Sequence, residues 1–564
     1  MSKTYVIVGG SAAGPKTAAK IRRMAPEAEI IMIQKGKFLS MASCGFPYFV
    51  GGVFDDPNQL IATPTGAQRD PQFFSDVKNI KALTSTEVTA IDREKKVVHM
   101  RNLETGEEGV QHYDRLMIAT GATAIMPNLP GKDLEGVTTL QSMEDAIYLK
   151  ERLTSGSLKK AVIVGGGLIG IETCEALQLG GVQITVVEML DQVLSFLDWE
   201  MAKHVENHIR SKGSEVITGC GVTEFLGKDG KVIGVKLADG RVLDCDLAVV
   251  AIGVRPNSGL AKAAGLEIGS CGGIKVNTFM QTSDRDIYAG GDCVEVTNLV
   301  THQKMIWPMG DAANLEGRVA AQNMVLGNNV EYDGFIGTGI CKVFDYVAGS
   351  TGLSEKQAKR LGYCNIMTAV QAAPDRPGFM GARPVIIKLV ADRTTCRLLG
   401  MQAIGTGDVS KRIAIGAMAI HAKMRVFDLV NLDLPYAPPF SPAIDNFIIA
   451  AHVLQNKCLG RMEGISSLDV KAKLDAGEVP FLLDVRSPEE FMQMRLGIGE
   501  VLIPQEKLRF SRDKLPKDKD KEIIVFCKIS LRGYEAYCFL KSWGYTNVRV
   551  MEGGILSWPF PREK

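Results

Sequence analysis

The sequence has no surplus of charge of either sign and no long apolar run. Its 65 Lys and Arg residues nearly balance its 64 Asp and Glu residues, for a formal charge of +1. This balance argues against a general nucleic-acid binder and against a polybasic membrane anchor. No window of about 18 uncharged apolar residues occurs, so we expect no transmembrane helix. The apolar run Tyr5–Val8 is too short for a signal peptide. We therefore expect a cytoplasmic protein with no nucleic-acid or membrane partner.

Cysteine is too sparse for a disulfide framework, with 12 residues in a chain of 564. A hydrophobic content of 46% and a charged content of 23% exclude a largely disordered chain. The length allows about three or four domains. Glycine is plentiful at 59 residues, which without a collagen period indicates tight turns and phosphate loops.

The first glycine loop joins a short β-branched run, TYVIVGG, to a helix predicted over residues 13–24 and a second strand predicted over 29–35. It reads Gly9-Gly10-Ser11-Ala12-Ala13-Gly14, a variant of G-x-G-x-x-G. Small residues there let backbone N–H groups approach a pyrophosphate at a helix N-terminus. Gln34, followed by Lys35, stands where an acidic residue would bind a ribose, and it can still hydrogen-bond a hydroxyl. Taken alone, the loop fits a tight strand–helix turn equally well.

The second glycine loop matches the dinucleotide pattern fully. Residues 159–170 end in Gly165-Gly166-Gly167-Leu168-Ile169-Gly170, and Glu188 ends the strand that follows the next helix. A carboxylate at that place accepts from a ribose 2′-hydroxyl and repels a 2′-phosphate. The loop therefore predicts a dinucleotide site that favours NADH over NADPH.

Three further segments join these loops: Ala119-Thr120-Gly121, the stretch 251–258 around Gly253, and Gly290-Gly291-Asp292. Together they resemble the two-dinucleotide-binding flavoprotein family, whose disulfide reductases carry FAD and NAD(P)H. The resemblance covers roughly residues 1–450. It implies two Rossmann-like domains followed by an α+β dimerisation domain, and it assigns Asp292 to the FAD ribitol or pyrophosphate.

Cys44 lies in a Gly/Pro loop without a second Cys at dithiol spacing. A lone Cys is usually a small buried hydrophobe. The segment Ser40–Tyr48, however, resembles the S-x-x-x-C-G-x-P-Y segment of coenzyme A disulfide reductases, NADH oxidases and NADH peroxidases. In these enzymes one cysteine cycles against the flavin as a coenzyme A mixed disulfide, a persulfide or a sulfenic acid. The resemblance implies that Lys20, Arg23, Ser40 and Ser43 contact coenzyme A, although Arg23 fits a solvated helix face equally well.

The segment Asp433–Ser441 contains Tyr436-Ala437-Pro438-Pro439 and resembles the YAPP motif of the dimerisation domain. The resemblance implies a homodimer in which Tyr436 reaches the partner subunit's cysteine as a proton donor. A packed aromatic beside a proline turn is the alternative. Two departures from the family, Phe379 in place of a tyrosine and Ile444 in place of a lysine, favour a smaller group than coenzyme A disulfide.

The last hundred residues carry a second cysteine loop. Cys527-Lys528-Ile529-Ser530-Leu531-Arg532 follows the strand EIIVF and resembles the rhodanese loop, whose backbone N–H groups cradle an anionic sulfur. Asp484 and Arg486 are expected to hold the fold. Ser530 replaces the usual glycine and is expected to stiffen the loop, and Cys538 on the following helix is expected in the core. The alternative for Cys527 is an inert buried thiol.

The prediction is an α/β chain of five segments: 1–150 and 256–330 bind FAD, 151–255 bind NADH, 331–455 dimerise and 465–564 form a rhodanese domain. The resemblance to coenzyme A disulfide reductase–rhodanese fusions implies reduction by NADH of persulfide or polysulfide sulfur to sulfide. Coenzyme A persulfide is the expected substrate, Cys44 the reducing thiol and Cys527 the sulfur relay. Alternatives are a plain coenzyme A disulfide reductase, an NADH oxidase or peroxidase acting through a Cys44 sulfenate, and a non-catalytic flavin sensor. No metal site is predicted.

Overall fold

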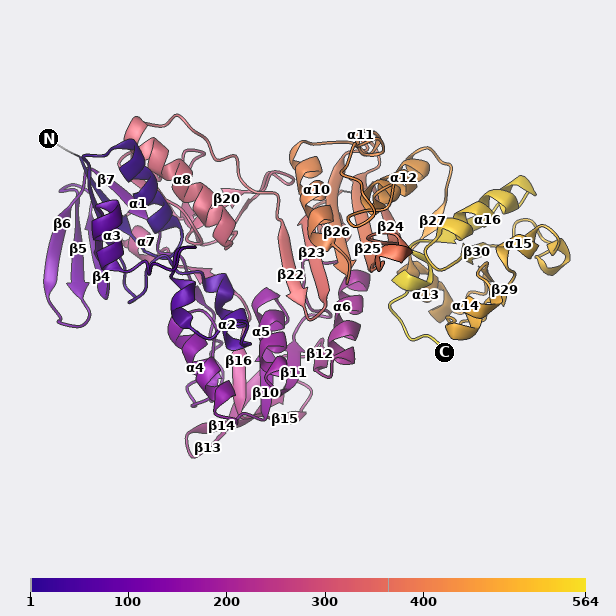
Figure 1. The fold of residues 1–564 in the computed structure, drawn as a ribbon, viewed down its shortest axis with the longest axis horizontal. Helices are drawn as coiled ribbons and strands as arrows, with labels where there is room; N and C mark the ends of the chain where they lie inside the picture. The colour runs from indigo at the N-terminus through magenta and orange to yellow at the C-terminus, as the bar shows by residue number, and fades with distance from the viewer. Residues whose placement is uncertain (1–2, 364, 564) are drawn as a thin grey trace. The chain divides into compact units, whose positions relative to one another are not determined.

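A computed structural model describes residues 3–363 and 365–563. The chain divides into two compact units, the first made of Met1–Asp191 and Gly213–Phe335 and the second of Gln192–Lys212 and Ile336–Lys564. Figure 1 shows the elements of both. Residues 192–212, which carry helix α6 (Trp199–Ser211), thus belong with the C-terminal half of the chain.

The first unit begins with a parallel sheet of order β19-β7-β1-β2-β3. Its central strands are runs of buried β-branched residues, as both faces of a parallel sheet require. Helices α1 (Ala13–Met24) and α8 (Gly310–Leu326) pack together at Gly317, where an added Cβ would lie 2.6 Å from the carbonyl oxygen of Ala13. The strands are β1 (Thr4–Val8), β2 (Glu29–Ile33), β3 (Lys81–Leu83), β7 (Arg115–Ile118) and β19 (Ile287–Ala289).

A second parallel sheet, of order β12-β11-β10-β16-β9, lies in the same unit. Helix α2 (Phe46–Val50) packs against α4 (Met143–Thr154) and α5 (Leu168–Leu179), so the Cys44 loop is supported by this part of the chain. The strands are β9 (Val137–Thr138), β10 (Lys160–Val164), β11 (Gln183–Glu188), β12 (Glu215–Thr218) and β16 (Leu247–Val250).

Smaller sheets and helices complete the first unit. They are β4 (Thr86–Asp92), β5 (Val97–Asn102) and β6 (Glu108–His112); β13 (Val222–Lys228), β14 (Lys231–Leu237) and β15 (Val242–Asp244); β8 (Ala122–Ala124) with β17 (Val254–Pro256); β18 (Ile274–Lys275), β20 (Val294–Thr297) and β21 (Lys304–Met305); and helices α3 (Pro71–Lys78) and α7 (Gly259–Ala263).

The second unit contains an antiparallel sheet of order β22-β23-β26-β25-β24. The buried ammonium of Lys388 on β25 lies 2.9 Å from Asp198 and 2.7 Å from Glu355, and it also contacts Glu200 of α6. This cation neutralises the carboxylate cluster and ties α6 to the sheet. The elements are β22 (Gly339–Val343), β23 (Tyr346–Gly352), β24 (Ile366–Pro374), β25 (Pro384–Asp392), β26 (Leu398–Gly405), α9 (Glu355–Arg360), α10 (Val409–His421), α11 (Val426–Leu429) and α12 (Asn446–Cys458).

The C-terminal part of this unit is a third parallel sheet, of order β27-β31-β30-β28-β29. It joins β24 through Glu552, whose carboxylate accepts from the Val370 N–H at 3.0 Å and pairs with the ammonium of Lys457. Its elements are β27 (Gly464–Ile465), β28 (Phe481–Asp484), β29 (Val501–Leu502), β30 (Ile523–Phe526), β31 (Val548–Met551), α13 (Ser467–Asp475), α14 (Pro488–Gln493), α15 (Gln505–Leu508) and α16 (Leu531–Ser542).

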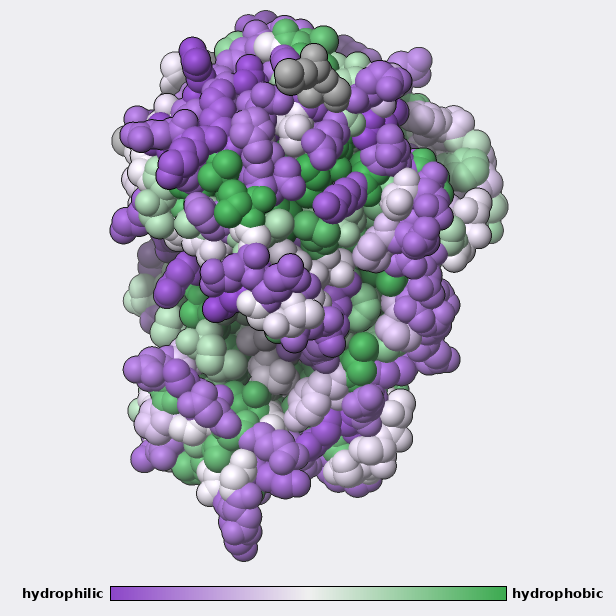
Figure 2. Space-filling view, turned by 90° about the vertical axis from the view of Figure 1, so that its left-hand side faces the viewer, coloured by the Kyte–Doolittle hydropathy of each residue, from purple (hydrophilic) through white to green (hydrophobic). Residues whose placement is uncertain are grey.

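Three parallel sheets flanked by helices, accompanied by one five-stranded antiparallel sheet and smaller antiparallel ones, confirm the predicted α/β class. Among the residues described, we find no helix with the length and apolar character needed to cross a membrane. Figure 2 shows one face of the molecule, on which polar side chains predominate and apolar ones form scattered small groups.

Candidate functional site

The first glycine loop turns sharply between β1 and α1. Gly9 has φ +116°, and a Cβ there would lie 2.0 Å from the carbonyl oxygen of Ala119. A Cβ on Gly14 would lie 1.8 Å from the carbonyl oxygen of Gly9, so both positions require glycine. No side chain caps α1 and no acidic residue occupies its first turn, and Ser11 and Ala12, directly before the helix, are half-buried. Its N-terminus therefore fits the pyrophosphate of FAD.

Gln34 and Lys35 follow β2 but point to different partners. The side-chain oxygen of Gln34 accepts a hydrogen bond from the Gly10 N–H at 2.8 Å, so Gln34 reaches the glycine loop. Lys35 is exposed and pairs with Glu87 at 2.8 Å. The structure thus brings Gln34, and not the Lys35 ammonium, to the predicted FAD site.

The segment after β19 is held by a buried carboxyl that no motif indicated. Gly291 has φ +84°, and its N–H donates to Glu316 of α8 at 2.6 Å. Burial, and then the charges of Asp292 and Asp311, raise the pKa of Glu316 to about 8, with the Gly291 hydrogen bond opposing them. Burial also raises the pKa of Asp292.

The predicted segment at the end of β7 meets the stretch 251–258. The Thr120 hydroxyl donates to the carbonyl of Asn257 at 2.7 Å, and the Asn257 amide donates back to the Thr120 carbonyl at 3.0 Å. Gly121 (φ +65°) and Gly253 (φ +113°) both need the left-handed region. Reciprocal hydrogen bonds therefore hold these two predicted segments against each other.

The second glycine loop repeats the geometry of the first. A Cβ on Gly170 would lie 2.0 Å from the carbonyl oxygen of Gly165, whereas a Cβ on Gly167 would meet no atom within 4 Å. Glu188 accepts from the Gly166 N–H at 2.6 Å and from the Leu190 N–H at 2.8 Å, which holds its carboxylate beside the loop. Ile169 is partly exposed in the first turn of α5. This arrangement fits NADH, because the open side of Gly167 would let a pyrophosphate approach the backbone.

Cys44 lies in a 3₁₀ turn, Ser43–Gly45, directly before α2. It is exposed, and a Cβ on Gly310 at the start of α8 would lie 3.9 Å from its Sγ. Local desolvation, and then the charges of Glu172, Asp292 and Asp311, raise the pKa of the Cys44 thiol. The structure therefore places Cys44 beside the start of α8, where the charge of Asp292, a predicted FAD-site residue, is among the carboxylates that oppose its ionisation.

The four residues predicted to contact coenzyme A lie on two elements of the first unit. Lys20 and Arg23 are on α1, half-buried and exposed respectively, and Ser43 is exposed beside Cys44. Ser40 has φ +49°, and its carbonyl accepts from Arg69 at 3.4 Å. Arg69 adds a positive charge to this loop that no motif indicated.

Tyr436 is 57% exposed in the second unit. Phe440 and Ile444, on the same segment, are also exposed, at 67% and 49%. Asp445, at the end of this segment, caps the N-terminus of α12 and pairs with Arg412 at 2.8 Å, which fixes the segment in place. An anchored segment that presents large apolar side chains outward is typical of a surface that another chain covers.

Cys527 is buried at the end of β30. A Cβ on Gly554 would lie 2.4 Å from the Cys527 carbonyl oxygen, so the Gly553-Gly554 turn packs directly on the loop. Ser530 adopts φ +84° despite its side chain, and its hydroxyl donates to the Met551 carbonyl at 3.2 Å. The carbonyl of Ile529 accepts from Gln371 of β24 at 3.3 Å. The loop from Lys528 to Leu531 is thus supported from two sides.

Arg532 is oriented by α14. It donates two hydrogen bonds to the carboxylate of Glu490, at 2.7 and 2.8 Å. Glu490 also accepts from the Ser487 N–H at 3.1 Å as part of a capping box, and the Arg532 pair lowers its pKa to about 2. The adjacent pair of Asp484 and Arg486 is buried, with a contact of 2.7 Å.

The expectation for Cys538 is wrong. Cys538 is exposed on α16, because the buried face of that helix is formed by Ala536, Tyr537 and Leu540.

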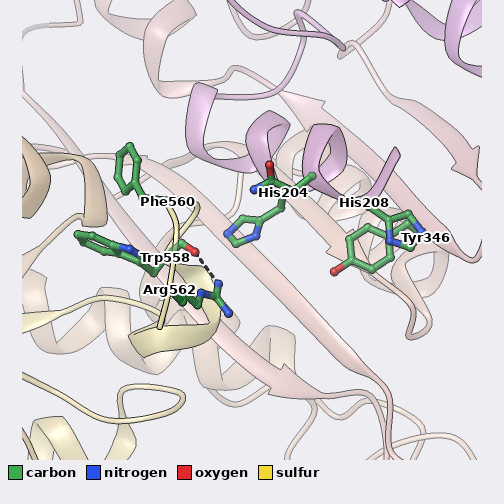
Figure 3. A pocket seen from close by; sticks show the side chains of 7 residues that line it. His204, His208, Tyr346, Trp558, Phe560 and Arg562 are labelled. Atoms are coloured by element: carbon green, nitrogen blue, oxygen red, sulfur yellow. Dashed lines mark hydrogen bonds between the residues drawn. The ribbon is translucent and has the colours of Figure 1, made fainter. Parts of the chain in front are cut away.

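A cavity of about 330 Å³ in the second unit contains none of the predicted site residues. It lies between α6, β23 and the segment 558–562, as Figure 3 shows, and Tyr346 stacks on His208 with ring centroids 3.9 Å apart. Burial lowers the pKa of His204 to about 4, so this imidazole is neutral at physiological pH.

Residues 3–313 match the family described as pyridine nucleotide-disulphide oxidoreductase, residues 338–447 match its dimerisation domain, and residues 466–559 match the rhodanese-like domain. The chain is 33% identical over 465 residues to the NAD(P)H coenzyme A polysulfide/persulfide reductase of Pyrococcus horikoshii, covering 81% of this chain and 99% of that protein. It resembles the structure of a NAD-dependent persulfide reductase from A. fulgidus, with a TM-score of 0.93, 43% identity and coverage of 98% of this chain and 100% of the other. It also resembles reduced Bacillus anthracis CoADR-RHD, with a TM-score of 0.92, 35% identity and coverage of 99% and 98%.

Proposed function

The chain belongs to the pyridine nucleotide-disulphide oxidoreductase family, and from this premise we propose that it reduces the outer sulfur of a persulfide or polysulfide to sulfide at the expense of NADH. The balanced reaction is NADH + H⁺ + R–S–SH → NAD⁺ + R–SH + H2S, with coenzyme A as the proposed thiol R–SH. The observation that carries the proposal is that one chain holds both an exposed single cysteine, whose thiol feels the charge of the predicted FAD-site residue Asp292, and a rhodanese-like cysteine loop.

Enzymes of this family use FAD and NAD(P)H. For this chain, the proposed cofactors are FAD and NADH. Gly9, Gly14, Gln34 and Asp292 would hold FAD, while Gly167 and Glu188 would hold NADH. FAD bound there would supply Cys44 with the two electrons that come from NADH. The carboxylate of Glu188, fixed by two backbone N–H groups, supports the preference for NADH because it would repel a 2′-phosphate.

Cys44 is proposed to attack the outer sulfur of the persulfide. The S–S bond of R–S–SH breaks, R–SH leaves with a proton, and the outer sulfur remains on Cys44 as a persulfide. Two electrons then release that sulfur as sulfide and restore the Cys44 thiol. Cys527, in its supported loop, is proposed to accept sulfane sulfur and pass it to the thiol carrier.

Replacing Cys44 by Ser tests this proposal. We expect sulfide release to be lost while NADH still bleaches the flavin, since the nucleotide sites are untouched. Cys271→Ser, at an exposed cysteine of the same unit, should retain full turnover. Full sulfide release by Cys44→Ser would contradict the proposal. Oxygen consumption that far exceeds sulfide release would instead favour an NADH oxidase, the activity for which a similar protein of Methanocaldococcus jannaschii is named.

The chain contains a dimerisation domain, and we propose a homodimer in which Tyr436 serves Cys44 of the partner subunit. The exposed Phe440 and Ile444 support a covered surface on this segment. Mixed dimers of a Cys44→Ser chain and a Tyr436→Phe chain test the arrangement. If Tyr436 acts across the dimer, each mixed dimer keeps one intact site and about half the activity. If it acts within its own chain, both sites are damaged and the mixed dimer is no better than Tyr436→Phe alone.

A further inference from the structure

Cys396 and Cys458 bring two thiols together in the second unit, although they are 62 residues apart in the sequence. Their Sγ atoms lie 3.5 Å apart, and both side chains are half-buried. No motif includes them, and the proposed reductase and sulfur-relay steps do not use them. We propose that this pair is a redox-active dithiol that persulfides or polysulfides oxidise to a disulfide with release of sulfide.

The geometry allows the bond with little movement of the backbone. A disulfide has an S–S distance of about 2.05 Å, so the two sulfur atoms must approach by roughly 1.5 Å. Cys396 lies in the turn between β25 and β26, whose residues 393–395 are exposed, and Cys458 is the last residue of α12. The Cys396 carbonyl accepts from the Val426 N–H at 2.8 Å, which holds the turn while the side chains rotate.

The two thiols have different roles in the proposed step. Desolvation, and then the hydrogen bond and charge of Cys396, raise the pKa of Cys458 to about 12, with Arg393 opposing them. Burial and the neighbouring sulfur thus keep the proton on Cys458. Cys396 lies beside the exposed residues 393–395, so Cys396 is the attacking sulfur.

The reaction balances as two successive displacements. Cys396 Sγ attacks the outer sulfur of R–S–SH, the S–S bond breaks, and R–SH leaves, so that Cys396 carries –S–SH. Cys458 Sγ then attacks Cys396 Sγ, and the outer sulfur leaves as H2S. The two thiols lose two electrons in total, the S–S bond of the persulfide gains them, and the two thiol protons end on R–SH and H2S.

The experiment uses the full-length holoprotein carrying Cys44→Ser and Cys527→Ser, so that neither predicted catalytic cysteine can react. The reduced protein is exposed to inorganic tetrasulfide without oxygen, free thiols are blocked, and peptides are analysed without reduction. We expect a Cys396–Cys458 linked peptide, two hydrogens lighter than its parts, and the loss of two blockable thiols. Because this background lacks the proposed reductase activity, the result does not depend on that proposal.

Matched variants complete the test. Adding Cys396→Ser should remove the linked peptide and leave Cys458 blockable, whereas adding Cys538→Ser, at an exposed single cysteine of the same unit, should change nothing. The proposal is overturned if both cysteines remain blockable after tetrasulfide, or if they carry sulfur without becoming linked. Linking to the same extent without tetrasulfide would overturn sulfane sulfur as the oxidant.

Discussion

Arg532 donates two hydrogen bonds to the carboxylate of Glu490, 42 residues away in the sequence, at 2.7 and 2.8 Å. A planar guanidinium paired in this way is fixed in direction as well as in position. The same carboxylate caps α14 through Ser487, so the start of that helix sets where the last residue of the Cys527 loop points.

We predict that Glu490→Gln lowers sulfur transfer by Cys527 by up to about tenfold, because a neutral amide accepts from only one arm of Arg532. Since the pKa of Glu490 is depressed to about 2, its support is complete above the unfolded value of 4.5 and is lost only as the pH falls toward 2. The ratio of wild-type to variant rates, measured from thiosulfate to cyanide, should therefore stay constant between about pH 5 and 9. Glu489→Gln, at the exposed neighbour, should match the wild type. An equal loss of rate in Glu489→Gln would show that the loss does not arise from the pair of Glu490 with Arg532.

We predict that Glu316→Gln makes folding stability less dependent on pH. The carboxyl keeps its proton to about pH 8 in the folded chain but loses it near pH 4.5 when unfolded. Between these values the folded state holds the extra proton, so the free energy of unfolding falls as the pH rises, by up to about 1.4 kcal/mol per pH unit. Urea midpoints from pH 5 to 8 should fall for the wild type and for the exposed Glu107→Gln, and stay flatter for Glu316→Gln. Parallel curves for all three proteins would contradict the shift.

We predict that Glu172→Gln makes Cys44 more reactive. Removing this negative charge lowers the pKa of the thiol, so more thiolate is present at any pH below it. The rate at which iodoacetamide labels Cys44 at pH 8 should rise severalfold. The exposed Glu144 on α4 is not among the charges that raise this pKa, so Glu144→Gln should leave the rate unchanged. An unchanged rate in Glu172→Gln would show that the charge of Glu172 does not raise the pKa of Cys44.

The two glycine loops give opposite predictions for one added methyl group. Gly14→Ala places Cβ 1.8 Å from the Gly9 carbonyl oxygen, so the turn must open and the purified protein should lose FAD. Gly167→Ala meets no protein atom within 4 Å, so the melting temperature should be unchanged while KM for NADH rises about tenfold. Flavin absorbance, thermal unfolding and steady-state kinetics measure these effects. Full flavin content in Gly14→Ala would contradict the assignment of the first loop to FAD. An unchanged KM in Gly167→Ala would contradict the assignment of the second loop to NADH.

Local patterns in the sequence predict much of the fold. The helix at residues 13–24 has the predicted bounds, and the predicted strand at 29–35 ends two residues early at Ile33, because glycines and β-branched runs mark such boundaries well. Contacts between distant segments left no local signal. Glu490 with Arg532, and Cys396 with Cys458, meet only in the folded chain.

Cys538 shows a second limit of the sequence. The sequence predicts its place on a helix, but which face of that helix it occupies depends on the sheet that packs against Ala536 and Leu540. The sequence around Glu316 likewise indicates an ordinary glutamate on a helix surface. In the folded chain the Gly291 turn covers Glu316 and buries it.

The attachment of the Cys527 domain to β24 sets how sulfur can travel. Glu552 is 4% exposed, and it joins the Gly553-Gly554 turn to Val370 and Lys457. These contacts hold the domain at the Gly553-Gly554 turn, which packs on the Cys527 loop. We therefore do not expect this domain to swing as a whole to carry sulfur to another site. In the proposed relay, a small thiol would then have to carry the sulfur, and the rate of supply should follow the concentration of that thiol rather than the rate of a hinge motion.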